Sequence, residues 1–597
     1  MFSIILRSWE LLTRRQKVVT GGIALSRVLV NGLDLLALSL TALLVSLATG
    51  ASLEIPIIRD ILGLFQEPIV ALLILTALIF ALKSVLALFL FHLTYIFLAR
   101  VETAASMKIV ESVFGSGLTR LKKFGKSELD WIVLRSTKVA FSDVLGSATL
   151  FLAEATLAAM IIVVFIAADW LMAICAIVYF SAIAVAFHLF SRARIIKAGQ
   201  DFSVGTVSAG QALRDLAGAF REISVSAKKP FFIERIRESR KAVSLSQAKA
   251  HYIQAIPRII VEMGLIMGAI AFLVVEYIRT NGEPDVSVLA IFFIGGLRMM
   301  ASLLPLQRAL IAMRYNQAPA AAAQKILKDM ATQPAPAIQG NVDAPLVSDA
   351  APSVQIKALS FKYEDSEGES PALDGISLDV EPGGFTALIG PSGGGKSSLI
   401  DIILSLHSPT SGEVLIDGQP SSLYQESHPG LVAYVPQNFG AVSGSIRDNV
   451  ALGVPGHGVD DDRVWKALDD AQLGEVVRAM PHGINSDLGK NTDSLSGGQM
   501  QRLGIARALY LRARLLILDE ATSALDPETE SEILSILLNL RGSTTIVVVA
   551  HRLSTIKKAD RIYVLQTGKL VASGTFNELQ RSSDLVKRFI RLMSLDD

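Results

Sequence analysis

The chain has 597 residues, of which 51% are apolar and only 19% charged, and its formal net charge is +1. This length is enough for several domains, and the composition is too apolar for a water-soluble protein of this size. The near-zero net charge gives no electrostatic reason to expect a nucleic-acid partner. The single cysteine, Cys175, excludes an intrachain disulfide, and we expect it to pack within an apolar run.

Six apolar segments follow a basic N-terminus, and each is close to the length that crosses a bilayer. No cleavage signature stands out near the first, so we expect an uncleaved membrane anchor. The loops that precede the third and fifth segments are rich in Lys and Arg, whereas the other loops are short and carry few. Basic loops stay on the cytoplasmic side, which predicts that both termini are cytoplasmic. The segments lie at roughly 19–48, 68–99, 141–168, 170–192, 255–279 and 287–312.

The two basic loops are longer than a connection requires. We expect their helices to continue past the bilayer, with tips near Leu118–Phe124 and Ala212–Phe220. The first outer loop, 53–65, has apolar residues at 58, 61, 62 and 65, which fits a short amphipathic helix at the outer membrane surface. A hydrophobic loop packed on the helix bundle is the alternative.

Several ionisable residues fall inside the apolar segments. Charge within a membrane is costly, so these side chains should face a cavity, an interface or each other. The cations among them are candidates for contacting an anionic substrate, and internal ion pairing or snorkelling toward the headgroups is the alternative. The substrate candidates are Arg27, Lys83, Arg298 and, at the start of the fifth segment, Arg258; the acidic residues are Asp34, Glu154, Glu262 and Glu276.

The composition changes after the sixth segment. From about 316 to 352 the chain is rich in Ala, Pro, Gln and Ser; the part through Met330 is predicted to be helical and the rest to be a linker. We therefore expect a six-helix membrane domain at 1–315, a linker at 316–352 and an α/β domain at 353–597.

The α/β domain contains a phosphate-binding loop of the form G-x-x-x-x-G-K-S. A buried strand is predicted before it at 385–389 and a helix after it at 399–404, which is the context that this motif needs. Backbone N–H groups and the helix N-terminus would bind phosphates there, Lys396 would reach the β- and γ-phosphates of ATP, and Ser397 would ligate Mg²⁺. The loop comprises Gly390, Pro391, Ser392, Gly393, Gly394, Gly395, Lys396, Ser397 and Ser398.

Two further motifs follow in order. The apolar run 515–518 predicts a buried strand that ends at Asp519 and Glu520; Asp519 can hold Mg²⁺, and Glu520 can act as the general base for the attacking water. A glycine-rich turn, Leu495–Gln499, opens a helix and is a second anion site. One nucleotide does not need two such sites in one domain. We therefore expect the turn, with Ser496, Gly497, Gly498 and Gln499, to meet the γ-phosphate bound by another copy of the chain.

These motifs, together with Ser523-Ala524-Leu525-Asp526 and His551, resemble the nucleotide-binding domain of an ABC transporter over roughly 353–590. The resemblance implies a P-loop α/β domain with an antiparallel β subdomain, and ATP and Mg²⁺ as cofactors. It also implies roles for four more residues: Tyr363 stacks on adenine, Gln437 contacts Mg²⁺ and senses the membrane domain, Asp526 links the two sites of a dimer, and His551 contacts the γ-phosphate. Gln437 and His551 would be catalytic together with Glu520.

The motifs of one nucleotide site are complete, which favours a homodimer with two working sites. One stretch departs from the family pattern. Exporters of this family usually have Gly-Glu-x-Gly before the signature turn, whereas this chain has Gly489-Lys490-Asn491-Thr492. Because the family's glutamate contacts the membrane domain, Lys490 puts the details of coupling at this position in doubt.

The membrane half resembles a type IV exporter half-transporter, and within that class the bacterial lipid-linked oligosaccharide flippases, on Ala255–Glu262 and the outer loop 53–65. This implies a multi-pass protein of the bacterial inner membrane that contacts membrane lipids. It would flip an amphipathic substrate, a lipid-linked oligosaccharide or another glycolipid, outward. A multidrug, lipid or peptide exporter is the alternative. A regulated channel or non-transporting regulator is a third reading, against which the intact catalytic residues argue.

Overall fold

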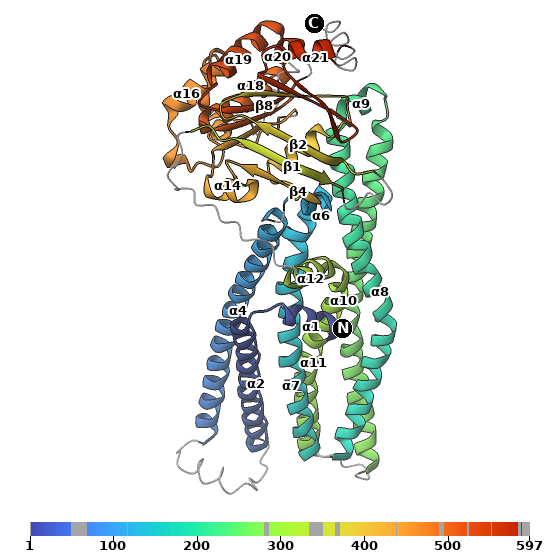
Figure 1. Ribbon diagram of the computed structural model, residues 1–597. Coiled ribbons are helices and arrows are strands. Elements are labelled where there is room, and N and C mark those ends of the chain that lie inside the picture. Colours follow the sequence, from blue (N-terminus) through green and yellow to red (C-terminus); the bar gives the residue numbers. More distant parts are fainter. Residues whose placement is uncertain are drawn as a thin grey trace. The chain divides into compact units, whose positions relative to one another are not determined.

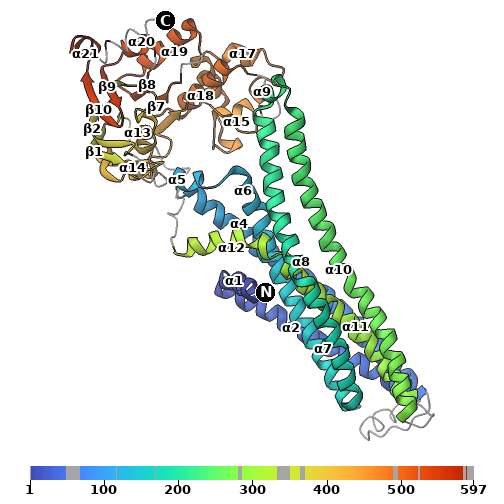
Figure 2. The same cartoon turned by 90° about the vertical axis from the view of Figure 1, so that its right-hand side faces the viewer.

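The computed structural model describes residues 2–48, 68–115, 117–168, 170–279, 286–332, 350–363, 370–437, 439–488, 495–521, 525–550, 552–582 and 587. The chain divides into two compact units (Figures 1 and 2). The first comprises Met1–Ser116 and Arg120–Pro336, and the second comprises Gly117–Thr119 and Ala337–Asp597. Each unit has hydrophobic cores of its own.

The first unit is helical, and its long helices begin in or near the predicted apolar segments. Helices α4, α8 and α10 continue well beyond those segments, as predicted, and α8 and α10 run side by side in both views (Figures 1 and 2). Among the described residues, Arg14–Thr41, Ile69–Gly115 and Lys126–Val163 are long and apolar enough to cross a bilayer. The long helices are α2 (Arg14–Ala48), α4 (Pro68–Gly115), α7 (Val144–Ala168), α8 (Trp170–Gly218), α10 (Lys229–Arg279) and α11 (Val286–Tyr315).

The first loop tip forms where it was predicted, with α5 (Leu118–Lys122) at the turn. The second tip begins within the predicted range, where α8 ends at Gly218, and it includes a short helix, α9 (Phe220–Val225), that extends beyond that range. Residues 212–217 are good helix formers, and Gly218 is the first residue that favours an end. The predicted outer-surface helix at 53–65 falls outside the described residues.

A buried set of hydrogen bonds, here called the N-terminal clamp, joins distant segments of the first unit. The Gln324 side chain on α12 (Gln317–Thr332) donates to the Ile4 carbonyl at 3.1 Å and to the Ser8 hydroxyl at 2.7 Å, both on α1 (Phe2–Glu10). Ser8 in turn donates to a carbonyl of the π-helical turn η2. The clamp includes a helix, α1, that the sequence did not predict. The turns that connect α6 (Lys126–Trp131) to α7 are η1 (Ile132–Ser136) and η2 (Val139–Asp143).

The second unit contains two sheets and confirms the predicted α/β fold with an antiparallel β subdomain. The smaller sheet is antiparallel, in the order β2-β1-β4-β5: β1 (Val354–Phe361), β2 (Leu373–Val380), β4 (Ser411–Ile416) and β5 (Gln419–Pro420). In the larger sheet, of order β10-β9-β3-β8-β7-β6, only β10 is antiparallel to its neighbour among the described strands. It comprises β3 (Phe385–Ile389), β6 (Val432–Val435), β7 (Leu515–Asp519), β8 (Thr545–Val549), β9 (Arg561–Gln566) and β10 (Lys569–Gly574).

The central strands of the larger sheet are buried on both faces, which explains their continuous apolar sequence. In β7, Leu515 and Ile517 pack into the core that holds helix α13 (Lys396–Ile403), whereas Leu516 and Leu518 pack into the opposite core with α16 and α18. This two-sided packing gives the loops at the strand ends a rigid base.

The other helices are α14 (Ser421–Ser427), α15 (Ile446–Val450), α16 (Asp461–Asp470), α17 (Gly474–Arg478), α18 (Gly497–Leu511), α19 (Pro527–Asn539), α20 (Leu553–Ile556) and α21 (Phe576–Ser582), with 3-10 turns η3 (Gly456–Gly458) and η4 (Gly483–Asn485).

Candidate functional site

The phosphate-binding loop connects β3 directly to α13, as the sequence predicted. Gly390 and Gly395 have φ values of 150° and 100°, in the region that favours glycine. A Cβ at Gly390 would lie 2.0 Å from the Leu565 carbonyl oxygen, and one at Gly395 would lie 2.9 Å from that of Ala372. These glycines are therefore required for the loop to pack against the sheet while its amides remain available to an anion.

Lys396 lies at the first position of α13, with its ammonium folded back over the loop. Its Nζ donates to the carbonyls of Gly390 at 2.9 Å and Pro391 at 3.1 Å, and the residue is 7% exposed. Burial lowers the pKa of Lys396, while Glu520 and Asp519 oppose that change. A buried cation beside the backbone amides of a glycine-rich loop suits a phosphate ligand.

The two carboxylates at the end of β7 lie in different environments. Asp519 is buried and hydrogen-bonded to Tyr434; burial and the neighbouring Glu520 raise the pKa of the Asp519 carboxyl. Glu520 follows with φ +50° and accepts a hydrogen bond of 2.5 Å from the Gln437 side chain. Strand order thus brings Glu520 and Gln437, which are more than eighty positions apart, into contact, and their catalytic roles stay predictions.

The predicted Mg²⁺ ligands, Ser397, Gln437 and Asp519, offer only oxygen donors to a cation. Mg²⁺ prefers oxygen ligands and is commonly held by one or two protein groups together with nucleotide phosphates and water. Within the described part of the chain, no cluster of three or more His, Cys, Asp or Glu side chains could hold a metal alone. The residues therefore fit a magnesium ion that arrives with a nucleotide, and the ion would neutralise phosphate charge there.

The predicted adenine platform is held by contacts that the sequence did not indicate. The Tyr363 hydroxyl hydrogen-bonds the Ser398 hydroxyl at 2.9 Å, which connects the ring to the phosphate-binding loop. The ring packs edge-on against Phe361, with centroids 4.8 Å apart, and against the buried His407 at 5.6 Å. Tyr363 is 37% exposed, so part of its surface remains open to a planar base.

The glycine-rich turn forms a well-capped helix start. Ser496 caps α18: its hydroxyl accepts from the Gln499 amide at 3.3 Å, and the Gln499 side chain accepts from the Ser496 amide at 2.8 Å. Ser496 and Gly497 are exposed. The contact between this turn and a nucleotide on a second copy stays a prediction.

Asp526 caps α19. It accepts hydrogen bonds from the amide and the hydroxyl of Thr529, at 2.9 and 2.8 Å, and the amide hydrogen bond lowers the Asp526 pKa most. Two other predicted positions, His551 and Lys490, lie outside the described residues. The residue after His551, Arg552, pairs with the buried Glu530 of α19, a contact that no sequence pattern indicated.

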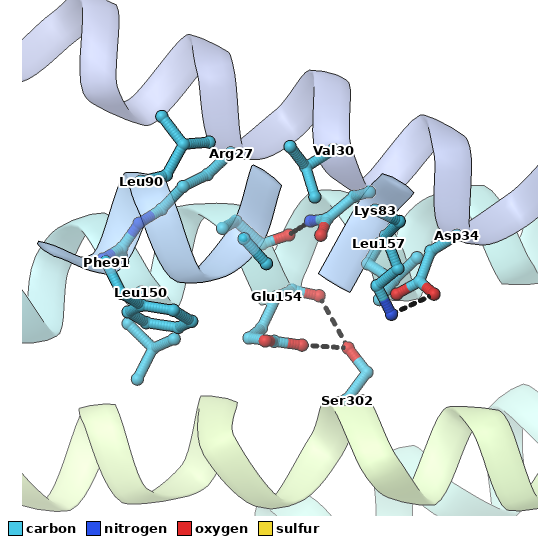
Figure 3. Close-up of a pocket in the computed structure, with 13 residues that line it drawn as sticks. Arg27, Val30, Asp34, Lys83, Leu90, Phe91, Leu150, Glu154, Leu157 and Ser302 are labelled. Atoms are coloured by element: carbon cyan, nitrogen blue, oxygen red, sulfur yellow. Dashed lines mark hydrogen bonds and ion pairs between the residues drawn. The ribbon is translucent and has the colours of Figure 1, made fainter. Parts of the chain in front are cut away.

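A pocket of about 210 Å³ lies within the first unit and is lined from α2, α4, α7 and α11. Two of the predicted substrate residues, Arg27 and Lys83, line it, together with the carboxylates of Asp34 and Glu154 (Figure 3). Lys83 forms an ion pair with Asp34 at 2.5 Å. The pocket thus contains two carboxylates as well as the two predicted cations. For Lys83, the structure supports the alternative considered above, an internal ion pair.

The other two substrate candidates do not line this pocket. Arg258 is exposed on α10 and pairs with Glu262 one turn later, at 2.7 Å. Arg298 lies on α11, and its side chain is not among those described. Roles for both in substrate contact stay predictions.

Comparisons with known proteins agree with the motifs. The ABC transporter family profile matches residues 373–523. The ATP-dependent lipid A-core flippase of Burkholderia orbicola (strain AU 1054) is 44% identical over 41% of this chain and 41% of its own length. The mycobactin import ATP-binding/permease protein IrtB of Mycolicibacterium smegmatis is 40% identical over 43% of this chain and 44% of its own. A multidrug resistance ABC transporter ATP-binding and permease protein of Lactococcus lactis subsp. lactis is 38% identical over 40% of each.

Each of these alignments spans less than half of the relative. Among solved structures, a bacterial Atm1-family ABC exporter with ATP bound matches 97% of this chain and 98% of its own, with a TM-score of 0.72. The sequence identity of that match is 22%, so it bears on the fold alone. The chain therefore carries an ABC transporter domain on the fold of an ABC exporter.

Proposed function

We propose that this protein uses ATP hydrolysis to move an amphipathic substrate from the cytoplasmic to the outer side of a membrane. The observation that carries the proposal is the presence, in one chain, of a candidate nucleotide site and of long apolar helices that line a charged pocket. A pocket with both charged and apolar walls suits a molecule with a polar head and an apolar body.

The chemistry of the cycle follows from the nucleotide site. Glu520, held by Gln437, would accept the proton of the water that attacks the γ-phosphate. Lys396 and the loop amides would stabilise the phosphate charge. Two copies would close on two ATP molecules, each copy supplying its Ser496 turn to the other, and hydrolysis would let them separate. ATP would bind the closed state more tightly than the separated state, and its binding would therefore shift the membrane units toward the conformation that accompanies closure.

The finer proposal is that the substrate is a lipid-linked oligosaccharide or another glycolipid, moved across a bacterial inner membrane with both termini cytoplasmic. Relatives named lipid A-core flippases support a lipid substrate. Relatives named multidrug resistance transporters support the second candidate, export of amphiphilic drugs.

A transport assay tests this proposal. The purified chain is placed in liposomes, and ATP hydrolysis and outward movement are measured with polyprenyl-pyrophosphate glycans, diacyl lipids and amphiphilic drugs. We expect lipids to stimulate hydrolysis and to move only when ATP is present. Stimulation by drugs alone would replace the lipid proposal with the second candidate, and hydrolysis that no amphiphile changes would refute transport of this class.

The shared nucleotide site can be tested by cross-linking. Cys175 is the only native cysteine. In a Cys175→Ser background, Ser392→Cys and Ser496→Cys would place one thiol on the phosphate-binding loop and one on the glycine-rich turn. We expect an ATP-dependent disulfide that joins two copies. A bond that forms within one chain, or no bond with ATP present, would contradict the shared site.

A further inference from the structure

The membrane-unit pocket holds two pairs of opposite charges, but only one pair is in contact. Figure 3 shows Arg27 beside Phe91 at one end and the Lys83–Asp34 ion pair at the other, with Glu154 between them. Among the described residues, neither Arg27 nor Glu154 has an oppositely charged atom within ion-pair distance. The pocket therefore presents one cation and one anion that are not neutralised by direct contact.

Arg27 is 8% exposed, and the described residues use only two of its five N–H donors in hydrogen bonds. Its two terminal nitrogens each make one long hydrogen bond of 3.4 Å, to the hydroxyls of Thr149 and Thr94. The guanidinium also lies 4.8 Å from the centre of the Phe91 ring. A guanidinium has five N–H donors in a fork that matches the oxygens of phosphate or carboxylate. The unused donors suit an anionic group of a ligand.

Glu154 has the complementary property. One carboxylate oxygen accepts a hydrogen bond from the Ser302 hydroxyl at 2.9 Å, and Ser302 also contacts the Glu154 backbone carbonyl at 3.0 Å. Within the part of the chain that the structure describes, its other carboxylate oxygen accepts none. An ionised carboxylate can accept about four hydrogen bonds. The remaining capacity suits a group with several N–H donors, such as an ammonium.

The size and walls of the pocket limit what can bind. The pocket has a volume of about 210 Å³ and is partly open, so it can hold a headgroup while the rest of a lipid lies outside it. The apolar part of the wall includes Leu90, Leu150 and Leu157. Long hydrocarbon chains would therefore remain outside this pocket, while its polar centre holds the head.

The geometry points to a lipid headgroup that carries both a phosphate and a primary ammonium group, with the phosphate at Arg27 and the ammonium at Glu154. This inference rests on the proposed ATP-driven transport of an amphipathic substrate, and it favours a lipid with this headgroup over a lipid whose head is a neutral glycan. A headgroup with only a phosphate would leave the Glu154 carboxylate without a cation and would be repelled by it. A headgroup with only an ammonium would leave the Arg27 guanidinium without an anion and would be repelled by it. A neutral sugar would neutralise neither charge in surroundings of low polarity, where unpaired charge is costly.

The test compares headgroups on identical acyl chains. The full-length chain in liposomes is given acyl-labelled phosphatidylethanolamine, which has both charges, phosphatidylglycerol, which has only the anion, and a diacyl trimethylammonium lipid, which has only the cation. Wild-type protein should move phosphatidylethanolamine with a kcat/KM about tenfold or more above either other lipid. Soluble phosphoethanolamine should compete only at much higher concentration. Equal potency of the soluble compound would overturn the assignment to a lipid.

The two charges should control selectivity in opposite senses. Glu154→Gln should remove most of the preference over phosphatidylglycerol, and Arg27→Gln should remove most of the preference over the cationic lipid. Arg27→Lys should retain part of it, because the charge remains. The matched controls are Arg237→Gln and Glu234→Gln, which alter an exposed ion pair on α10 and should leave selectivity unchanged.

The outcomes separate the two proposals. If wild-type protein moves all three lipids equally, or if Glu154→Gln and Arg27→Gln retain wild-type selectivity, the headgroup assignment is wrong and the transport proposal stands. If no lipid moves or stimulates ATP hydrolysis, the headgroup assignment is wrong, and the transport proposal is wrong as well only if the polyprenyl-pyrophosphate glycans and the amphiphilic drugs also leave hydrolysis unchanged. Where a pocket variant does not fold, as judged by its ATP binding, wild-type selectivity and phosphoethanolamine competition decide the question alone.

Discussion

Replacing Glu520 by glutamine should stop ATP hydrolysis while nucleotide binding persists. In the structure, one Glu520 oxygen accepts a 2.5 Å hydrogen bond from the Gln437 side chain, and a carboxamide oxygen can accept the same bond. The change therefore preserves shape and removes only the ability to accept a proton. Glu520 also raises the pKa of Asp519, so its neutralisation should leave Asp519 more readily ionised for Mg²⁺.

The size of the effect follows from the role assigned to this residue. General-base catalysis contributes about 10²- to 10⁴-fold in rate, which is about 2.7–5.5 kcal/mol of transition-state stabilisation. We expect kcat for ATP hydrolysis to fall by at least about a hundredfold. The dissociation constant for MgATP should stay within about threefold of wild type, because no phosphate contact is lost.

Steady-state hydrolysis and equilibrium binding of a labelled ATP, both with the full-length chain, measure these two quantities. The matched control is Glu413→Gln, which alters an exposed ion pair with Lys357 on the smaller sheet and should change neither. A Glu520→Gln variant that retains more than about a tenth of wild-type kcat would refute the general-base assignment. A variant that loses ATP binding would instead assign Glu520 to ligand or metal binding.

Three further predictions concern the second unit. Gly390→Ala should weaken ATP binding by more than about tenfold in an equilibrium titration, because the new methyl would lie 2.0 Å from the Leu565 carbonyl oxygen. Asp519→Asn should abolish MgATP binding yet raise the unfolding temperature without nucleotide. Because the Asp519 pKa is raised in the folded state, the stabilising contribution of this carboxyl is present below the unfolded-state pKa and is lost as pH rises through the folded-state pKa. In a pH series of thermal unfolding, the unfolding temperature of the wild type should therefore fall further below that of Asp519→Asn as pH rises. Glu530→Ala should destabilise the fold by about 2 kcal/mol, measured as a lower unfolding temperature, because it leaves the partly buried Arg552 without its carboxylate; an unchanged value would refute that role.

Much of the nucleotide site could be predicted because its determinants are local. The phosphate-binding loop needs glycines at fixed spacing between a buried strand and a helix, and Gly390–Ser398 contains all of them within nine residues. Likewise, Asp519 and Glu520 directly follow an apolar strand. The fold class could be predicted for the same reason, since apolar segments long enough to span a bilayer and the strand–loop–helix context of the phosphate-binding motif are visible in short windows.

The remaining features depend on packing between distant segments. His407 supports the Tyr363 ring from 44 positions away, and no spacing rule links them. The ion pair of Lys83 with Asp34 depends on how α2 and α4 are rotated against each other, which segment length and hydropathy do not determine. The short helix α9 at the second loop tip was not predicted, because hydropathy and loop length locate a turn but not the structure within it.

The N-terminal clamp fixes α1 to α12, so the first helix of the chain supports a helix more than 300 residues later. Gln324, the residue that holds α1, lies 320 positions along the chain from its acceptor at Ile4, on the last helix described before the nucleotide unit begins. Removing α1, or fusing a bulky group directly to it, would thus release Gln324 and weaken the packing of α12, the helix that leads toward the ATPase unit. A free leader of several flexible residues is the safer way to attach anything at that end.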